Sequence, residues 1–293
     1  MQQTTTEILS VFEKKMRLNG LAKKTIRSYK QALKDYCLFS EDFVLGNVAE
    51  YLNQKKIKVD NLKISRSHYN QVQYSFDKFW QIFYNKRLSI LNKLDVPQIT
   101  PEVLNEEQII KALDSYTRRQ HKIIFGLAYF SMLRHAEIWT LDLYADIDVD
   151  NLRVYVRHGK GWKPRVTILS TYIRNLILEE RIERKSENNP NPWVCAKQGS
   201  KDRYLCYSEI GHIIKDAGNA IGRKDLHPHL LRHTGATHYD EQGVSTRKIQ
   251  KLEGHQKIGT TQGYIHPTQD KVLEVKNKLD VLLLQSKKNG DNN

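Results

Sequence analysis

The sequence predicts a mainly α-helical protein with a small antiparallel β-sheet, divided into two domains. Three observations lead to this prediction. The chain has 293 residues, enough for two ordinary domains, and 39% of them are hydrophobic, enough for two cores. Apolar side chains recur at helical spacing through most of the chain. A short central stretch instead alternates between polar and apolar residues with the period of two that is typical of strands.

Residues 1–90 are predicted to form a compact bundle of four helices. Apolar residues at helical spacing predict a first helix over 8–18, a second with Thr25 as its N-cap, a shorter third over 48–56 and a long fourth over 65–86. The lysines between these apolar positions would lie on the outer faces of the helices and give the bundle a basic surface.

The next segment, 91–104, holds two prolines and little periodicity, and we expect a linker there. A second domain is predicted over 105–286, followed by a frayed tail over 287–293. Its predicted strands cover 146–149, 152–157 and 165–169, and its predicted helices cover 106–117, 119–130, 172–185, 207–218, 229–243, 246–252, 260–264 and, last, about 268–286.

The formal net charge of +14 favours a polyanionic partner such as nucleic acid. The three cysteines are widely spaced and form neither a disulfide framework nor a metal-binding motif. The first residues lack the features of a signal peptide, and no apolar run is long enough to cross a bilayer. We therefore expect a cytoplasmic, nucleoid-associated protein with no membrane partner.

One tyrosine, Tyr264, is preceded by a set of cationic and imidazole side chains in separate segments. The set comprises Arg134, Lys160, His229, Arg232 and His255. A phenol attacks phosphorus when its proton is removed and when cations neutralise the phosphate. No cluster of acidic residues suited to two magnesium ions accompanies it. The combination predicts phosphoryl transfer on a nucleic-acid backbone without a metal or another cofactor.

These residues lie in stretches that resemble motifs of the tyrosine recombinases, the phage integrase family. The first arginine box resembles Leu133-Arg134-His135-Ala136-Glu137-Ile138, and the β-hairpin lysine resembles Gly159-Lys160-Gly161. The HxxR box resembles His229-Leu230-Leu231-Arg232. The final histidine and the nucleophile of the family resemble Gly254-His255 and Tyr264. The first lobe resembles the SAM-like core-binding domain of this family. The resemblance covers roughly the whole chain and is to the compact, Xer-like or small-integrase type.

The resemblance implies a role for each residue. Tyr264 would attack a DNA phosphorus to form a 3′-phosphotyrosine, and Arg134 and Arg232 would hold the non-bridging oxygens of the phosphate. Lys160 would protonate the departing 5′-oxygen, His229 would assist proton transfer, and His255 would donate to a phosphate oxygen. Glu137 would orient Arg134 from the same helical face. The sequence departs from the family pattern at Met132, where glycine is usual, at Glu253, where an apolar residue is usual, and at Gly263, where a bulkier residue is usual.

The expected function is site-specific DNA recombination through a Holliday junction. Two basic lobes would clamp duplex DNA that carries inverted-repeat core sites, and four subunits would assemble through the helix at 268–286, docked on a neighbour, with accessory or directionality proteins as further partners. Two alternatives stay open. One is a type IB topoisomerase-like enzyme that relaxes DNA, and the other is a catalytically inactive DNA-binding accessory protein.

Overall fold

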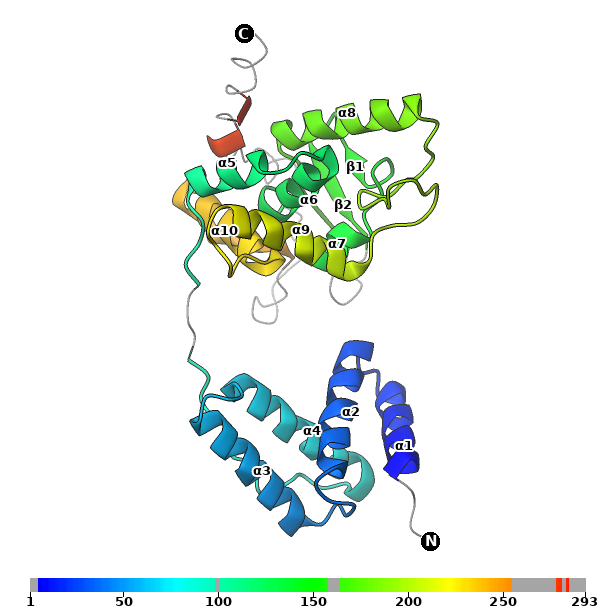
Figure 1. Ribbon diagram of the computed structural model, residues 1–293, viewed down its shortest axis with the longest axis vertical. Helices are drawn as coiled ribbons and strands as arrows, with labels where there is room; N and C mark the ends of the chain where they lie inside the picture. Colours follow the sequence, from blue (N-terminus) through cyan, green and yellow to red (C-terminus); the bar gives the residue numbers. More distant parts are fainter. Residues whose placement is uncertain (1–4, 98–100, 158–163, 255–277, 281–282, 285–293) are drawn as a thin grey trace, which may run out of the picture. The chain divides into compact units, whose positions relative to one another are not determined.

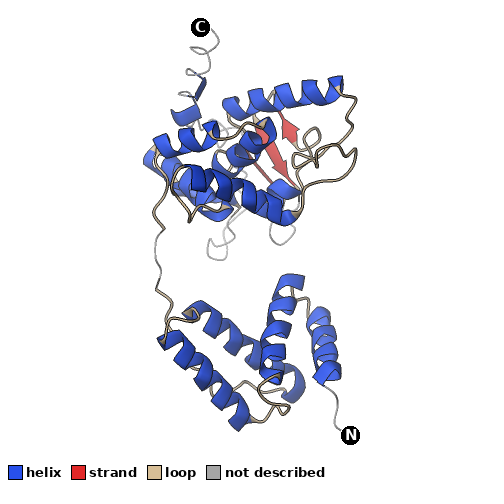
Figure 2. Cartoon of the chain, viewed as in Figure 1, coloured by secondary structure: helices blue, strands red, loops and turns tan. Residues whose placement is uncertain are grey.

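The structure, a computed structural model, describes residues 5–97, 101–157, 164–254, 278–280 and 283–284 (Figure 1). The chain divides into two compact units, Met1–Thr100 and Pro101–Asn293. In the described ranges the first unit is helical, and the second combines helices with a three-stranded antiparallel sheet (Figure 2). This confirms the predicted fold class. No helix within these ranges is both long enough and apolar enough to cross a membrane.

The first unit contains four described helices, as predicted. They are α1 (Thr5–Leu18), α2 (Lys23–Cys37), α3 (Leu45–Asp60) and α4 (Arg66–Tyr84). Two details of the prediction were wrong. Thr25 is not an N-cap, because α2 already begins at Lys23 after the extended residue Ala22. The helix expected over 48–56 spans 16 residues, because the buried face that begins at Val48 continues to Val59.

A row of polar side chains on α4 binds the segment that follows this helix. The Asn70 amide exchanges two hydrogen bonds with the backbone of Leu94, at 2.7 and 2.9 Å. The Gln73 amide does the same with Asn92, at 2.9 and 2.7 Å. Each amide thus occupies both the donor and the acceptor of one backbone unit. The first residues of the predicted linker therefore lie along α4, and the proposed domain limits stay a prediction.

The second unit is built around one large core. Its helices are α5 (Glu106–Asp114), α6 (Arg119–Tyr129), α7 (His135–Trp139), α8 (Thr171–Ser186), α9 (Tyr207–Ala220), α10 (Pro228–Glu241) and α11 (Thr246–Glu253), and its strands are β1 (Ile147–Asp148), β2 (Arg153–Val156) and β3 (Arg165–Ile168). The strands pair in the order β1-β2-β3, with Val154 opposite Ile147 on one side and Thr167 on the other. Helix α6 is buried in this core from Ile123 to Tyr129.

Helix α10 packs very closely on the end of α6. A Cβ atom at Gly235 would lie only 2.2 Å from the backbone oxygen of Tyr129. The Tyr129 hydroxyl is 2.7 Å from the Nδ1 atom of His238, and the Tyr239 hydroxyl donates to the carbonyl of Phe130 at 2.9 Å. These contacts fix the position of α10, which carries the HxxR box, relative to the segment that leads to Arg134.

The described residues of the last predicted helix pack on their own unit. Leu279 and Leu283 are buried in the large core. The Asp280 carboxylate accepts hydrogen bonds at 2.8 Å from the backbone N–H groups of Thr171 and Tyr172, in the first turn of α8. A carboxylate at this end of a helix is favourable because the free N–H groups and the helix dipole are positive there. For these residues the contacts are within the chain, and docking of the helix at 268–286 on a neighbouring subunit stays a prediction.

We predict that Gly235→Ala lowers the free energy of unfolding of the second unit. The added methyl would overlap a backbone oxygen, so α10 must move away from α6 at a cost of about 1–3 kcal/mol. Urea unfolding followed by circular dichroism would measure the change. Gly211→Ala is the matched control in α9, because its Cβ would lie 3.7 Å from His135, an ordinary contact. An equal loss in both variants would contradict the prediction.

Candidate active site

Arg134 stands directly before α7 and not within it. Its backbone is extended, with φ −73° and ψ 151°, and it is the N-cap of this helix. The Glu137 carboxylate accepts from the backbone N–H of Arg134 at 2.7 Å and from its Nη1 atom at 2.9 Å. The two residues therefore meet as predicted, but through a helix cap. The expectation that they share one helical face was wrong in this respect.

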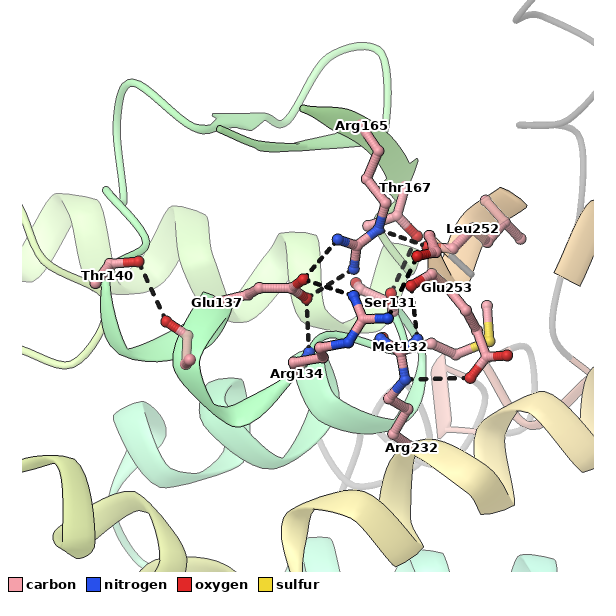
Figure 3. Close-up of polar contacts among 12 residues, drawn as sticks. Ser131, Met132, Arg134, Glu137, Thr140, Arg165, Thr167, Arg232, Leu252 and Glu253 are labelled. Carbon is pink, nitrogen blue, oxygen red and sulfur yellow. Dashed lines mark hydrogen bonds and ion pairs between the residues drawn. The ribbon is translucent and has the colours of Figure 1, made fainter. Parts of the chain in front are cut away.

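Glu137 is also held by an arginine that the sequence analysis did not single out. Arg165, the first residue of β3, binds the carboxylate with both terminal nitrogens, at 2.6 and 2.7 Å (Figure 3). Its Nε atom donates to the carbonyl of Leu252 at 2.9 Å. Burial alone would raise the pKa of Glu137, but the hydrogen bonds and charges of Arg165 and Arg134 hold it below its ordinary value. The carboxylate therefore stays ionised between two guanidinium groups.

Arg232 is the most deeply buried of the predicted site residues that the structure describes. Only 2% of it is exposed. Its Nε atom donates to the Glu253 carboxylate at 3.1 Å, Nη2 donates to the Glu253 carbonyl at 2.6 Å, and Nη1 donates to the Met132 carbonyl. Burial lowers the pKa of Arg232 to about 10, and the carboxylate of Glu253 opposes this shift. The guanidinium therefore remains charged at neutral pH.

The end of α11 lies against the same arginines. Gly254 caps this helix in the left-handed conformation, with φ 67°, which favours glycine. Its carbonyl is 3.4 Å from the Nη2 atom of Arg134. Glu253, one residue earlier, is the partner of Arg232. Glu253 and Gly254, which directly precede His255, therefore contact Arg232 and Arg134. These two arginines are the predicted phosphate clamp.

Met132 is one of the departures from the family pattern, and its surroundings explain how the chain accommodates it. Its φ of 49° lies in the left-handed region, where glycine is unstrained and other residues are not. The Met132 side chain is fully buried in a small core with Ile168, Tyr239, Ile249 and Leu252. Packing of this side chain offsets the strain that glycine would avoid, and the carbonyl still points to Arg232.

His229 lies one turn before Arg232 in α10. Partial burial lowers the pKa of this imidazole, and the positive charge of Arg232 lowers it further. At neutral pH the ring is therefore mainly uncharged and able to accept a proton, as the predicted role requires.

The structure thus brings Arg232 of α10 close to Arg134 and Glu137, which lie together at the start of α7. Lys160, His255 and Tyr264 lie outside the described residues. Arg165 and Glu253 are the site residues that sequence reasoning missed as partners of the clamp. The only available signal for Glu253 was its departure from the family pattern. Arg165 begins a predicted strand, and nothing in its spacing indicates Glu137 as its partner.

We predict that Arg165→Met destabilises the second unit strongly. Removing one partner of a buried ion pair leaves Glu137 undercompensated and costs about 3–5 kcal/mol. Arg119→Met is the control, because Arg119 pairs with the half-exposed Glu179 and Glu183 and its loss should cost about 0–1 kcal/mol. Thermal or urea unfolding of both variants would test this.

The pH dependence of this effect has a definite sign. The pKa of Glu137 is lowered in the folded protein, so its contribution to stability is present above the pKa of the unfolded chain and disappears as the pH falls through the folded value. The wild-type protein should therefore lose more stability on acidification than Arg165→Met. A constant difference between the two proteins from neutral to acidic pH would contradict this account.

Comparison with known proteins shows the family and the fold of the chain. Residues 100–271 match the phage integrase family. The chain is 26% identical over 279 residues to the tyrosine recombinase XerA of Thermococcus onnurineus, covering 94% of this chain and 96% of that protein. A lambda integrase dimer bound to a COC′ core site shares the fold, with a TM-score of 0.67, 16% identity and coverage of 89% of this chain and 100% of that chain. A lambda integrase tetramer bound to a Holliday junction gives a TM-score of 0.66 at 16% identity, covering 89% and 80%. Since the family match spans more than half of the chain, the protein belongs to the phage integrase family of tyrosine recombinases.

Proposed function

We propose that this tyrosine recombinase cuts and rejoins specific DNA sites through a 3′-phosphotyrosine intermediate. The observation that carries the proposal is the meeting of Arg134 and Arg232 at the end of α11. Their guanidinium groups come from the start of α7 and from α10, and both contact the residues directly before His255. Two fixed cations at one point suit the two non-bridging oxygens of a phosphodiester, where negative charge grows in the transition state.

Each proposed step uses residues of this chain alone. Tyr264 attacks the phosphorus, and its phenolic proton passes to a base, for which the neutral imidazole of His229 is suited. The phosphorus–5′-oxygen bond breaks, and Lys160 gives a proton to the departing oxygen. His255 donates to a phosphate oxygen. The energy of the broken bond is kept in the phosphotyrosine link, so the reverse attack by a 5′-hydroxyl rejoins the strand without ATP.

DNA binding is proposed to involve both units. The net charge of +14 supports a large electrostatic contribution from phosphate contacts, which would weaken steeply as salt rises. Sites with inverted-repeat core sequences are proposed by analogy with the core site in the lambda integrase complex. Accessory or directionality proteins, and a location in the cytoplasm at the nucleoid, remain predictions.

A tetramer on a Holliday junction is proposed by analogy with the lambda integrase assembly. Leu279 and Leu283 are already buried in their own unit. The contact with a neighbouring subunit would therefore come from other residues of the segment 268–286. A ring of four subunits would allow two active sites to work at a time and so exchange strands in sequence.

We predict that Tyr264→Phe abolishes covalent capture of DNA. The protein would be mixed with a nicked suicide duplex. After cleavage the short fragment that carries the new 5′-hydroxyl diffuses away, and the adduct would be scored on a denaturing gel. Loss of the phenolic oxygen should remove the adduct while leaving noncovalent binding within about threefold of wild type, since no phosphate-binding cation is changed. The duplex would come from sites that the protein occupies in its own genome.

Tyr144→Phe is the matched control, because Tyr144 is an exposed tyrosine of the same unit. This variant should form the adduct as well as wild type does. An adduct with Tyr264→Phe would show that another residue is the nucleophile. Relaxation of supercoiled plasmid without sequence preference, and without junction intermediates, would favour the topoisomerase alternative. DNA binding by wild type without any adduct would favour an inactive accessory protein.

A further inference from the structure

Arg232 is bonded to both described positions at which the chain departs from the family pattern. At Met132 the bond is to the backbone carbonyl, so it does not depend on the unusual side chain. At Glu253 the side chain itself takes part, because its carboxylate accepts from Nε of Arg232 at 3.1 Å. An ionised group thus stands beside the buried arginine where an apolar side chain is usual.

The charges around the clamp are unevenly paired. Arg134 and Arg165 share the carboxylate of Glu137, whereas Arg232 has the carboxylate of Glu253. Three guanidinium groups therefore face two carboxylates, which leaves one positive charge in excess. A phosphodiester also carries one negative charge, so the group of five side chains would be neutral with DNA bound. Without Glu253 the excess before DNA binding would be larger.

In the DNA-free protein Glu253 compensates the charge of the buried Arg232. Arg232 is only 2% exposed, so water cannot stabilise its charge fully. The carboxylate on Nε provides that stabilisation, and the Glu253 carbonyl on Nη2 fixes the orientation of the same guanidinium. In the complex a phosphate would offer the same kind of oxygen to the same cation. The Glu253 carboxylate and the DNA phosphate therefore both interact with the Arg232 guanidinium, and each weakens the interaction of the other with it.

We infer that Glu253 is a positioning residue that stands in for the scissile phosphate. Glu253 holds Arg232 in place before DNA binds. Its negative charge also reduces the affinity of Arg134 and Arg232 for the scissile phosphate, which takes over the stabilisation of Arg232 in the complex. The inference rests on the proposed function, since it requires Arg232 to face the reacting phosphodiester. Glu253 touches Arg232 and is given no contact with the reacting atoms.

The test compares two duplexes that differ by one charge. One carries the mapped cleavage site with its natural phosphodiester, and the other has an uncharged methylphosphonate at that position. Dissociation constants would be measured for Glu253→Gln in a Tyr264→Phe background, so that no covalent adduct forms. Glutamine keeps the size and the accepting oxygen of Glu253 and removes only its charge. Glu241→Gln, at the exposed end of α10, is the control for the general effect of removing one negative charge.

Glu253→Gln should bind the phosphodiester duplex about three- to tenfold more tightly than the parent protein. Its gain on the methylphosphonate duplex should be no larger than that of Glu241→Gln. The DNA-free Glu253→Gln protein should also melt at a lower temperature than Glu241→Gln. A residue needed only for folding would lower the melting temperature without tightening the binding of the charged duplex.

Glu253→Asp keeps the charge and shortens the side chain, so it separates charge from packing. It should keep the parent's preference between the two duplexes even if it melts lower, and it serves as the second variant should Glu253→Gln fold poorly. Equal gains for Glu253→Gln on both duplexes, no gain on the charged one, or a preference of Glu253→Asp that moves away from the parent's would overturn the inference. Failure of the proposed function is distinguishable, because wild-type protein would then form no adduct with the nicked duplex.

Discussion

A charged group that leaves water must be paired within the protein, and this constraint organises the site. Glu137 and Arg232 are both buried, and their partners come from other elements of the fold. Glu137 joins the start of α7 to β3 through Arg165, and Arg165 continues to α11 at Leu252. Any displacement of one element would leave a desolvated charge without its partner, which is far more costly than the loss of an exposed ion pair.

The same pairing limits how strongly the site can attract DNA. Each carboxylate that stabilises the folded protein also reduces the positive field that a phosphate experiences. Arg134 is the more accessible cation, with 26% of its side chain exposed against 2% for Arg232. The two arginines therefore differ in kind. Arg134 is set on a helix cap near solvent, whereas Arg232 is held inside the unit and depends on its internal partners.

Two of the three departures from the family pattern, Met132 and Glu253, lie within the described residues, and both contact Arg232. Met132 keeps a backbone conformation that favours glycine, and it combines that strain with a buried side chain in the small core under α11. Glu253 ends α11 and bonds to the arginine that also receives the Met132 carbonyl. Both departures therefore alter the surroundings of Arg232 without removing any of the groups proposed to act on the phosphate. Since Leu252 belongs to the same small core and also receives Arg165, packing and charge pairing are coupled here.

The sequence by itself determined the helical pattern, the short strands, the basic charge and the types of residue in the boxes, because periodicity and motif spacing are local properties. It did not determine that Thr25 lies inside a helix, that Arg134 meets Glu137 through a cap, or that Leu279 and Asp280 dock on their own unit. Only the tertiary structure paired Arg165 with Glu137 and Glu253 with Arg232. These partners are far apart along the chain, and a buried charge selects its partner by proximity in the folded state, which linear spacing does not encode.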